Sequence, residues 1–188
     1  IQGEDNATRI SDLSDFINSD RKHLGDKIII IMPNQFLVSD LFHKLILNDE
    51  ISQDYHILAE SITGSLNRIR RRIYETEKVI VILRERSFTG DNQTEISVLL
   101  YNLPFQSPGE TKIQAKYHYL KKTKDQTELF DDILLPQMIQ RIKNVINFIS
   151  NNYANEKLYI LDKRLYTKYY TKEILDQLEP MVEINILN

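Results

Sequence analysis

The sequence predicts an α/β domain built on a mostly parallel β-sheet with helices on both faces. Short β-branched apolar runs alternate along the chain with amphipathic segments of helical spacing, a pattern typical of parallel strands joined by crossover helices. Two runs, 27–32 and 78–83, are apolar without alternation, as expected of central strands covered on both sides. The chain has 188 residues, of which 41% are hydrophobic, so we expect one domain with one buried core.

The first half of the chain is predicted to contain three strands and two helices. Pro33-Asn34 ends the first strand, and the turn residues Thr63-Gly64-Ser65 begin the second helix. The expected elements are, in order, a strand at 27–32, a helix at about 36–47, a strand at 55–59, a helix at 66–73 and a strand at 78–83.

The second half is predicted to contain three more strands and an insertion. Residues from about 106 to 135 turn polar and basic, and we expect them to form outlying helices. Pro136 is placed in the first turn of its helix, where its missing N–H has no cost. The expected elements are a strand at 96–100, an outlying helix at about 113–120, a helix at 136–149, a strand at 158–161, a helix near 168–178 and a strand at 182–187.

Composition narrows the classes of protein that fit. The formal net charge of -3 gives no overall attraction to nucleic acid, so a DNA contact must come from a local basic patch. The absence of cysteine excludes disulfides and an iron–sulfur cluster within this sequence. No apolar run approaches the about 18 residues that span a bilayer, so we expect no membrane contact and a cytoplasmic location. The polar start without methionine indicates that residues 1–188 are one domain of a larger protein.

Motifs for self-sufficient chemistry are absent. The sequence has no GxxxxGK[ST] phosphate loop and no GxGxxG dinucleotide motif. Its four histidines are scattered without metal-ligand spacing, so no metal site is expected. Arg68, Arg71 and Arg72 share one helix face by their spacing. This face has two interpretations: contact with DNA phosphates, or a solvated surface partly neutralised by Glu75 and Glu77.

Three stretches in fixed order resemble the C-terminal motor lobe of DinG, an XPD-related member of the superfamily-two DNA helicases. They are the Leu-Pro-Phe segment at 100–108, the Leu-Pro-Gln segment at 134–143, and the Asp-x-Arg-Leu segment at 159–165. The resemblance implies a RecA-like three-layer fold, and a parent protein with a phosphate-loop lobe upstream of this chain. It also implies ATP and magnesium as cofactors of the parent, single-stranded DNA as partner, and in some relatives a linked 3'-5' exonuclease.

The sequence departs from this family where the family keeps its chemistry. The Gln, Gly and two Arg of motif VI correspond to Asn144, Asn147, Phe148 and Asn151. Motif V survives only as Ser87-Phe88-Thr89-Gly90, Arg84-Glu85 replaces the Gly-Thr before it, and Pro33-Asn34 replaces the Thr-Ser after the first strand.

The lost arginines set the expectation for catalysis. An arginine that stabilises the transferring phosphoryl group contributes roughly 10³–10⁵ in rate, or about 4–7 kcal/mol. Phe148 and Asn151 carry no positive charge, so we expect no catalytic residue in this chain. Arg141 is a candidate substitute, two helical turns or about 10 Å before Phe148 on the same face.

The sequence therefore predicts a degenerate motor lobe that binds DNA or regulates a linked nuclease in DNA repair or replication. The chain alone is not expected to be an enzyme, whereas the parent would be a hydrolase. Two alternatives stay open: a lobe of an active DNA-stimulated ATPase, and a partner-binding α/β domain unrelated to DNA. The candidate DNA-binding residues follow the predicted strands, where a RecA-like lobe meets DNA; they are Asn34, Gln35, Thr63, Gly64, Arg84 and Ser87.

Overall fold

The domain is built on a five-stranded sheet in which all strands are parallel, in the order β2-β3-β1-β4-β5. The computed structural model describes residues 6–84, 96–105, 115, 118–121, 125–152 and 157–178, with only the backbone for 6, 7 and 148–152. The strands are β1 (Lys27–Met32), β2 (His56–Ala59), β3 (Val79–Arg84), β4 (Ser97–Tyr101) and β5 (Lys157–Leu161). The predicted parallel α/β fold is confirmed, and five of the six expected strands are present. The sixth, at 182–187, lies outside the described residues.

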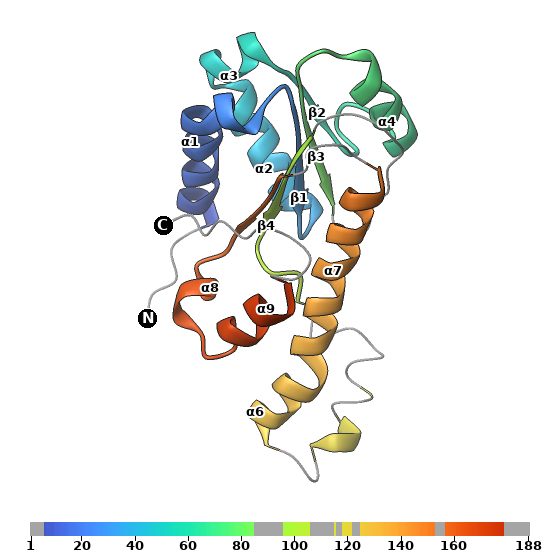
Figure 1. The fold of residues 1–188 in the computed structure, drawn as a ribbon. Helices are drawn as coiled ribbons and strands as arrows, with labels where there is room; N and C mark the ends of the chain where they lie inside the picture. Colours follow the sequence, from blue (N-terminus) through green and yellow to red (C-terminus); the bar gives the residue numbers. More distant parts are fainter. Residues whose placement is uncertain are drawn as a thin grey trace.

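Helices cover both faces of the sheet (Figure 1). One face carries α1 (Asn6–Leu24), α2 (Gln35–Ile46) and α3 (Asp49–Asp54), and the other carries α4 (Leu66–Glu75), α7 (Leu135–Asn152) and α9 (Thr171–Leu178). The shorter α8 (Arg164–Thr167) joins β5 to α9. The predicted single helix near 168–178 is thus wrong in its first turn, because the extended Lys168 separates α8 from α9.

Two hydrophobic cores lie on the two faces, and β1 shows how one strand serves both. Ile28, Ile30 and Met32 point to the core under α1 and α2, whereas Ile29 and Ile31 point to the core under α4 and α7. Successive side chains of a strand alternate between faces, so a strand buried on both sides must be apolar throughout. This requirement explains the uninterrupted isoleucines of the sequence.

Helix α1 was not predicted, although its signal is present. Ile10, Leu13 and Ile17 recur at helical spacing and are buried against the sheet. The polar residues between them lower the mean hydropathy of the segment, which hides a helix that packs by a narrow stripe. The consequence is a helix that lies beside the strands and covers one side of the sheet.

The helix predicted to begin at Pro136 begins ten residues earlier, so the prediction that Pro136 lies in a first turn is wrong. Helical residues run without a break through α6 (Gln126–Leu129), a π-helical stretch (Phe130–Leu134) and α7. Asp125 and Glu128 form a capping box at its start. The π-helical stretch explains how the helix accepts Pro136: Leu135 N–H already bonds Phe130 O, five residues back, and this wider turn relieves the clash that proline causes in an α-helix.

The long helix extends beyond the sheet at its α6 end (Figure 1). At 1.5 Å per residue, the run from Gln126 to Asn152 spans about 40 Å. Of the region expected as an insertion, 106–135, the structure describes 115, 118–121 and 125–135, and the last of these ranges is the projecting part of this helix. Among the described residues, no helix is both long and apolar enough to cross a membrane.

Candidate nucleic-acid interface at the carboxyl edge of the sheet

The carboxyl ends of the five strands meet along one edge of the sheet, because all strands are parallel. In open parallel sheets, ligands bind outside this edge, beside the point where successive connections leave in opposite directions. Here that point lies between β1, whose connection leads towards β2, and β4, whose connection leads to β5. Five of the six candidate DNA-binding residues lie on or next to this edge; Ser87 lies outside the described residues.

The two amides after β1 support the local backbone. Asn34 caps α2, because its side chain accepts a hydrogen bond from Leu37 N–H at 3.0 Å. Gln35 donates from Nε2 to the carbonyl of Glu60 at 3.0 Å and so ties the start of α2 to the residue after β2. The Gln35 Oε1 atom is buried without a hydrogen-bond partner in the described structure. Asn34 remains exposed at the edge, but its side-chain oxygen is already engaged.

The turn after β2 is closed by its own side chains. The Thr63 hydroxyl accepts from Ala59 N–H at 3.0 Å and donates to Ala59 O at 3.2 Å. Gly64 follows, and Arg68 lies directly over it: a Cβ atom at position 64 would be 3.1 Å from Arg68 Cδ. A side chain at position 64 would thus require a small shift of Arg68, and the approach shows that the Arg68 side chain runs back towards the start of α4.

Arg84, at the end of β3, is engaged by a buried carboxylate. Its Nε donates to Glu60 Oε1 at 3.0 Å, its backbone N–H donates to Glu60 Oε2 at 2.9 Å, and its Nη2 also contacts Oε1. The Glu60 side chain is only 6% exposed, and that of Arg84 is 43% exposed. The hydrogen bond and charge of Glu60 raise the pKa of Arg84. A phosphate at Arg84 would therefore meet a nearby negative charge. Sequence reasoning missed Glu60, which is separated from Arg84 by a whole helix.

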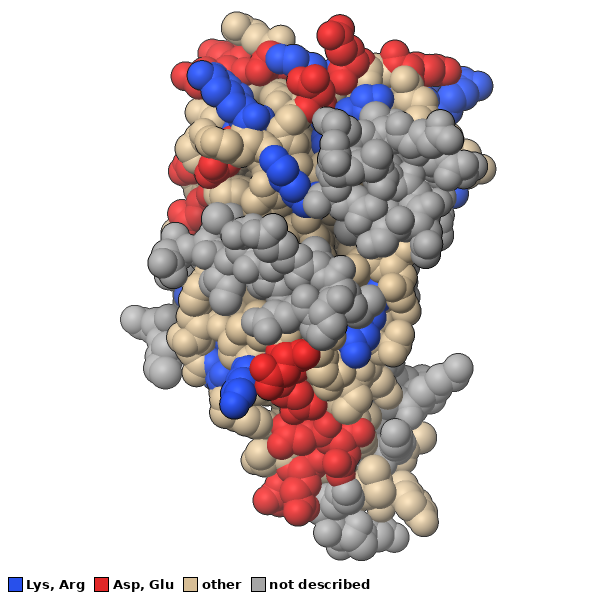
Figure 2. Space-filling view, in the orientation of Figure 1, with Lys and Arg blue, Asp and Glu red and all other residues tan. Residues whose placement is uncertain are grey.

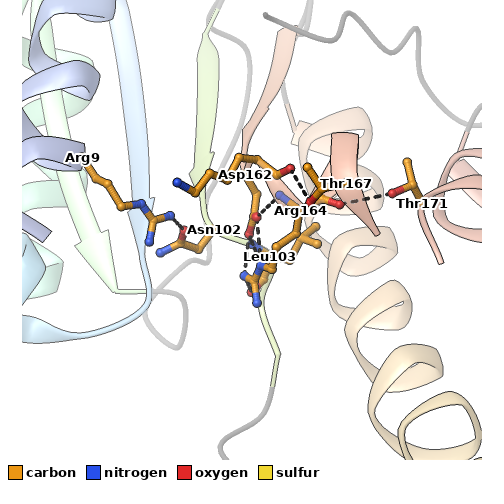
Figure 3. Close-up of polar contacts among 8 residues, drawn as sticks. Arg9, Asn102, Leu103, Asp162, Arg164, Thr167 and Thr171 are labelled. Carbon is orange, nitrogen blue, oxygen red and sulfur yellow. Dashed lines mark hydrogen bonds and ion pairs between the residues drawn. The ribbon is translucent and has the colours of Figure 1, made fainter. Parts of the chain in front are cut away.

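A second buried carboxylate holds the ends of β4 and β5 together (Figure 3). Asp162, whose side chain is 1% exposed, accepts hydrogen bonds from Leu103 N–H at 2.6 Å and from Arg164 N–H at 2.9 Å, and it pairs with the Arg164 guanidinium. Burial alone would raise the pKa of Asp162, but the hydrogen bonds from Arg164 and Leu103 outweigh burial and lower it. We call Asp162, Arg164 and Leu103 the Asp162 latch.

The Asp162 latch joins two of the stretches that carry the family resemblance. The guanidinium of Arg164 lies 5.0 Å from the centre of the Phe105 ring, and the Phe105 ring packs at 5.4 Å from Phe130 and 6.0 Å from Tyr170. The Leu-Pro-Phe segment and the Asp-x-Arg-Leu segment thus form one structural unit. It fixes the chain where it leaves β4 for the insertion, a role that the sequence pattern alone did not reveal.

An arginine from α1 covers the end of β4, beside the point between β1 and β4 where the connections leave in opposite directions. The Arg9 guanidinium donates to Asn102 Oδ1 (Figure 3) and lies 5.4 Å from the centre of the Tyr101 ring. Asn102 has a left-handed backbone conformation, with φ of 69°, which asparagine tolerates better than most residues. The crevice where ligands bind in related architectures is therefore bordered by the protein's own cation.

The residues at the motif VI positions lie along α7. Asn144 accepts a hydrogen bond from Gln140 at 3.0 Å, and Asn147 is exposed. Phe148 and Asn151 lie in the last turns of α7, with side chains outside the described residues, and the last turn contains no basic residue. Arg141 donates to the carbonyl of Pro104 at 3.4 Å, at the carboxyl edge of β4. In the described part of the chain, no group of histidines or acidic residues is arranged to hold a metal ion.

Comparisons with known proteins identify the fold. No family model matches the chain, and no curated protein matches its sequence. Two solved structures are similar: one titled XPD helicase, with 13% identity and a TM-score of 0.68 over 100% of this chain and 33% of that chain, and Xpd4 of S. tokodaii, with 16% identity and a TM-score of 0.56 over 88% and 32%. This chain spans about a third of either. The predicted RecA-like α/β fold is confirmed, whereas the motor role and membership of the DinG type stay predictions.

Proposed function

We propose that the chain is the second RecA-like lobe of a DinG-type DNA motor that has lost ATP-driven unwinding. The observation that carries this proposal is the similarity of fold to an XPD helicase along the whole chain, combined with a motif VI helix that has no cation in its last turn. The fold supports a motor lobe, and the missing charge supports its degeneracy.

The parent protein would supply what this chain lacks. The sequence has no phosphate loop, and the chain spans about a third of the similar solved structures. We expect an upstream lobe to bind ATP and magnesium, and single-stranded DNA to lie across both lobes. This lobe would contribute backbone N–H groups at its carboxyl edge, around Asn34, Gln35, Thr63 and Gly64, together with the side-chain N–H₂ of Asn34, which track phosphates without reading sequence.

Such a lobe would serve as a platform for DNA. Without the guanidinium, the transition state for phosphoryl transfer loses about 4–7 kcal/mol of stabilisation, so hydrolysis is too slow to drive strand separation. Binding to DNA does not need this group. We therefore propose that the parent uses the lobe to hold single-stranded DNA for a linked 3'-5' exonuclease in cytoplasmic DNA repair or replication.

The test is an ATPase assay on the full-length protein with and without single-stranded DNA. The wild type should show little turnover and no stimulation, and Phe148→Arg should raise turnover; Phe148→Gln, which is polar but uncharged, is the control. Robust DNA-stimulated turnover of the wild type would instead identify an active motor lobe. DNA binding at background level, measured on the same protein, would reject both motor interpretations and favour a partner-binding domain.

A further inference from the structure

We infer that Arg68 of α4, supported by Arg71, is the cation with which this lobe binds the phosphate backbone of single-stranded DNA, in place of Arg84. This inference rests on the proposed function, because it assigns the contact within the proposed DNA interface. It reverses what the sequence predicts, where Arg84 is the DNA-binding residue and the arginines of α4 have two open interpretations.

The first observation is the difference in partners between the two arginines. Arg84 is engaged by the buried carboxylate of Glu60 through its side chain and its backbone. The Arg68 guanidinium has no ion pair or hydrogen bond to any residue that the structure describes. A phosphate at Arg84 would have to compete with a carboxylate that has lost its hydration, whereas a phosphate at Arg68 displaces only water.

The second observation is the position of Arg68. Its Cδ lies 3.1 Å from the place that a Cβ of Gly64 would occupy, so the side chain is directed back over the turn between β2 and α4. This turn belongs to the carboxyl edge of the sheet, where the proposed DNA path runs. The charge of Arg68 is thereby brought from the helix face to the same edge as Thr63 and Gly64, although α4 itself lies against one face of the sheet.

The surroundings of Arg68 favour an anion. Ser65 precedes α4 but its side chain makes no capping hydrogen bond, so the first N–H groups of the helix lack a side-chain acceptor, and this end of a helix attracts negative charge. Arg71 lies one turn further on. Its ion pair with Glu75 is 3.5 Å long, and the two side chains are 77% and 60% exposed. Exposed pairs of this kind are weak, so Arg71 can exchange Glu75 for a phosphate.

The distribution of charge favours a DNA path near α4 over one near the projecting end of the long helix. Figure 2 shows acidic side chains gathered at the lower end, around α6 and α9, whereas at the upper end, over α3 and α4, acidic and basic side chains are mixed. The acidic residues of that end are Asp125, Glu128, Asp131, Asp132, Glu173 and Asp176. Their field repels a polyanion, so the strand should cross the α4 end of the carboxyl edge and avoid the projecting helix.

The test measures binding of a fluorescent oligo(dT) to the 188-residue chain by anisotropy, as a function of salt. Arg68→Gln should weaken binding severalfold, and Arg68→Gln with Arg71→Gln should weaken it further. The slope of log affinity against log salt should become shallower by about 0.7 per arginine removed. Arg84→Gln and Arg21→Gln remove the same charge elsewhere and should bind nearly as the wild type does; Arg21 lies in α1, on the other face of the sheet.

Each outcome has a distinct meaning. Binding that falls with Arg84→Gln but not with Arg68→Gln would overturn this inference and leave the proposed function intact. Equal losses for all single variants would also overturn it, because net charge alone would then explain binding. A wild-type chain that does not bind oligo(dT) at low salt would overturn the proposed DNA interface together with this inference. Thermal melting of each variant checks that a loss of binding is not a loss of fold.

Discussion

Replacing Asp162 with asparagine should strongly destabilise the domain. The carboxylate is buried and accepts hydrogen bonds from Leu103 N–H at 2.6 Å and from both the backbone and the side chain of Arg164. Asparagine keeps one acceptor oxygen but places an N–H₂ group against donors and leaves the half-buried guanidinium without a counter-charge. Removal of one partner from a fully buried pair costs about 3–5 kcal/mol.

The expected loss is smaller here, because the Arg164 side chain is 37% exposed and water partly screens it. We expect Asp162→Asn to lower the free energy of unfolding by about 2–4 kcal/mol, a large share of the 5–15 kcal/mol typical of a domain. Urea unfolding at pH 7 measures this difference. Arg164→Gln should cost at least as much, because it leaves the buried carboxylate without its counter-charge. Adding it to Asp162→Asn should cost little more, because the two side chains stabilise the fold as a pair.

The pH dependence of this difference tests the same reasoning. The pKa of Asp162 is lowered from the ordinary value of 3.8 by its hydrogen bonds. The unfolded state therefore takes up a proton before the folded state does, so the stabilisation is present above about pH 4 and is lost as the pH falls through the lower folded pKa. The difference in free energy of unfolding between the wild type and Asp162→Asn should therefore decrease at acid pH. A loss below about 1 kcal/mol at neutral pH, or a gap that is constant down to pH 2, would refute the account of the Asp162 latch.

Three further predictions concern other contacts. Glu60→Gln should lower stability, because Arg84 loses its ion pair, and should raise affinity for oligo(dT), because the Arg84 guanidinium can then contact a phosphate; unchanged affinity in the anisotropy assay would contradict the proposed path of the strand. Asn34→Ala should cost about 1 kcal/mol in urea unfolding through loss of the α2 cap, and Asn48→Ala, at the cap of α3, gives a comparison on the same face. Tyr169 donates to Asp131 at 2.6 Å, and this hydrogen bond raises the pKa of Tyr169 to about 12. In an absorbance titration, Tyr169→Phe should therefore remove the ionisation of one tyrosine at high pH. A loss of absorbance change near pH 10 instead would count against this hydrogen bond.

The sequence was a good guide to the sheet and a poor one to the contacts at its edge. Uninterrupted apolar runs such as Ile28–Ile31 leave few alternatives to a buried strand, so the strands were found within a residue or two. Helix α1 was missed because only a narrow stripe of its residues is apolar and buried. Pro136 was misplaced because the preference of proline for the first turn of a helix does not take account of a π-helical turn. The helix start at Asn34 and the turn at Thr63 could be predicted, because each depends on hydrogen bonds between residues close in sequence.

The contact between Glu60 and Arg84 could not be predicted from the sequence, for a different reason. It depends on the register of β2 against β3, in which Ala59 pairs with Ile82 and Glu60 therefore lies beside the last residues of β3. Strand register is set by the packing of the whole sheet, and no local pattern shows it. The same holds for Asp162 and Leu103, which meet because β4 and β5 end side by side.

The unbroken helix from Gln126 to Asn152 has a mechanical consequence. A continuous helix is stiff, and this one is held by the sheet along α7 while its α6 end stands free of it (Figure 1). The rings of Phe105, Phe130 and Tyr170 pack where the helix leaves the sheet. A sideways push on the free end is therefore resisted at these rings, because the arm held by the sheet, from Phe130 to Asn152, is several times longer than the free arm from Gln126 to Phe130.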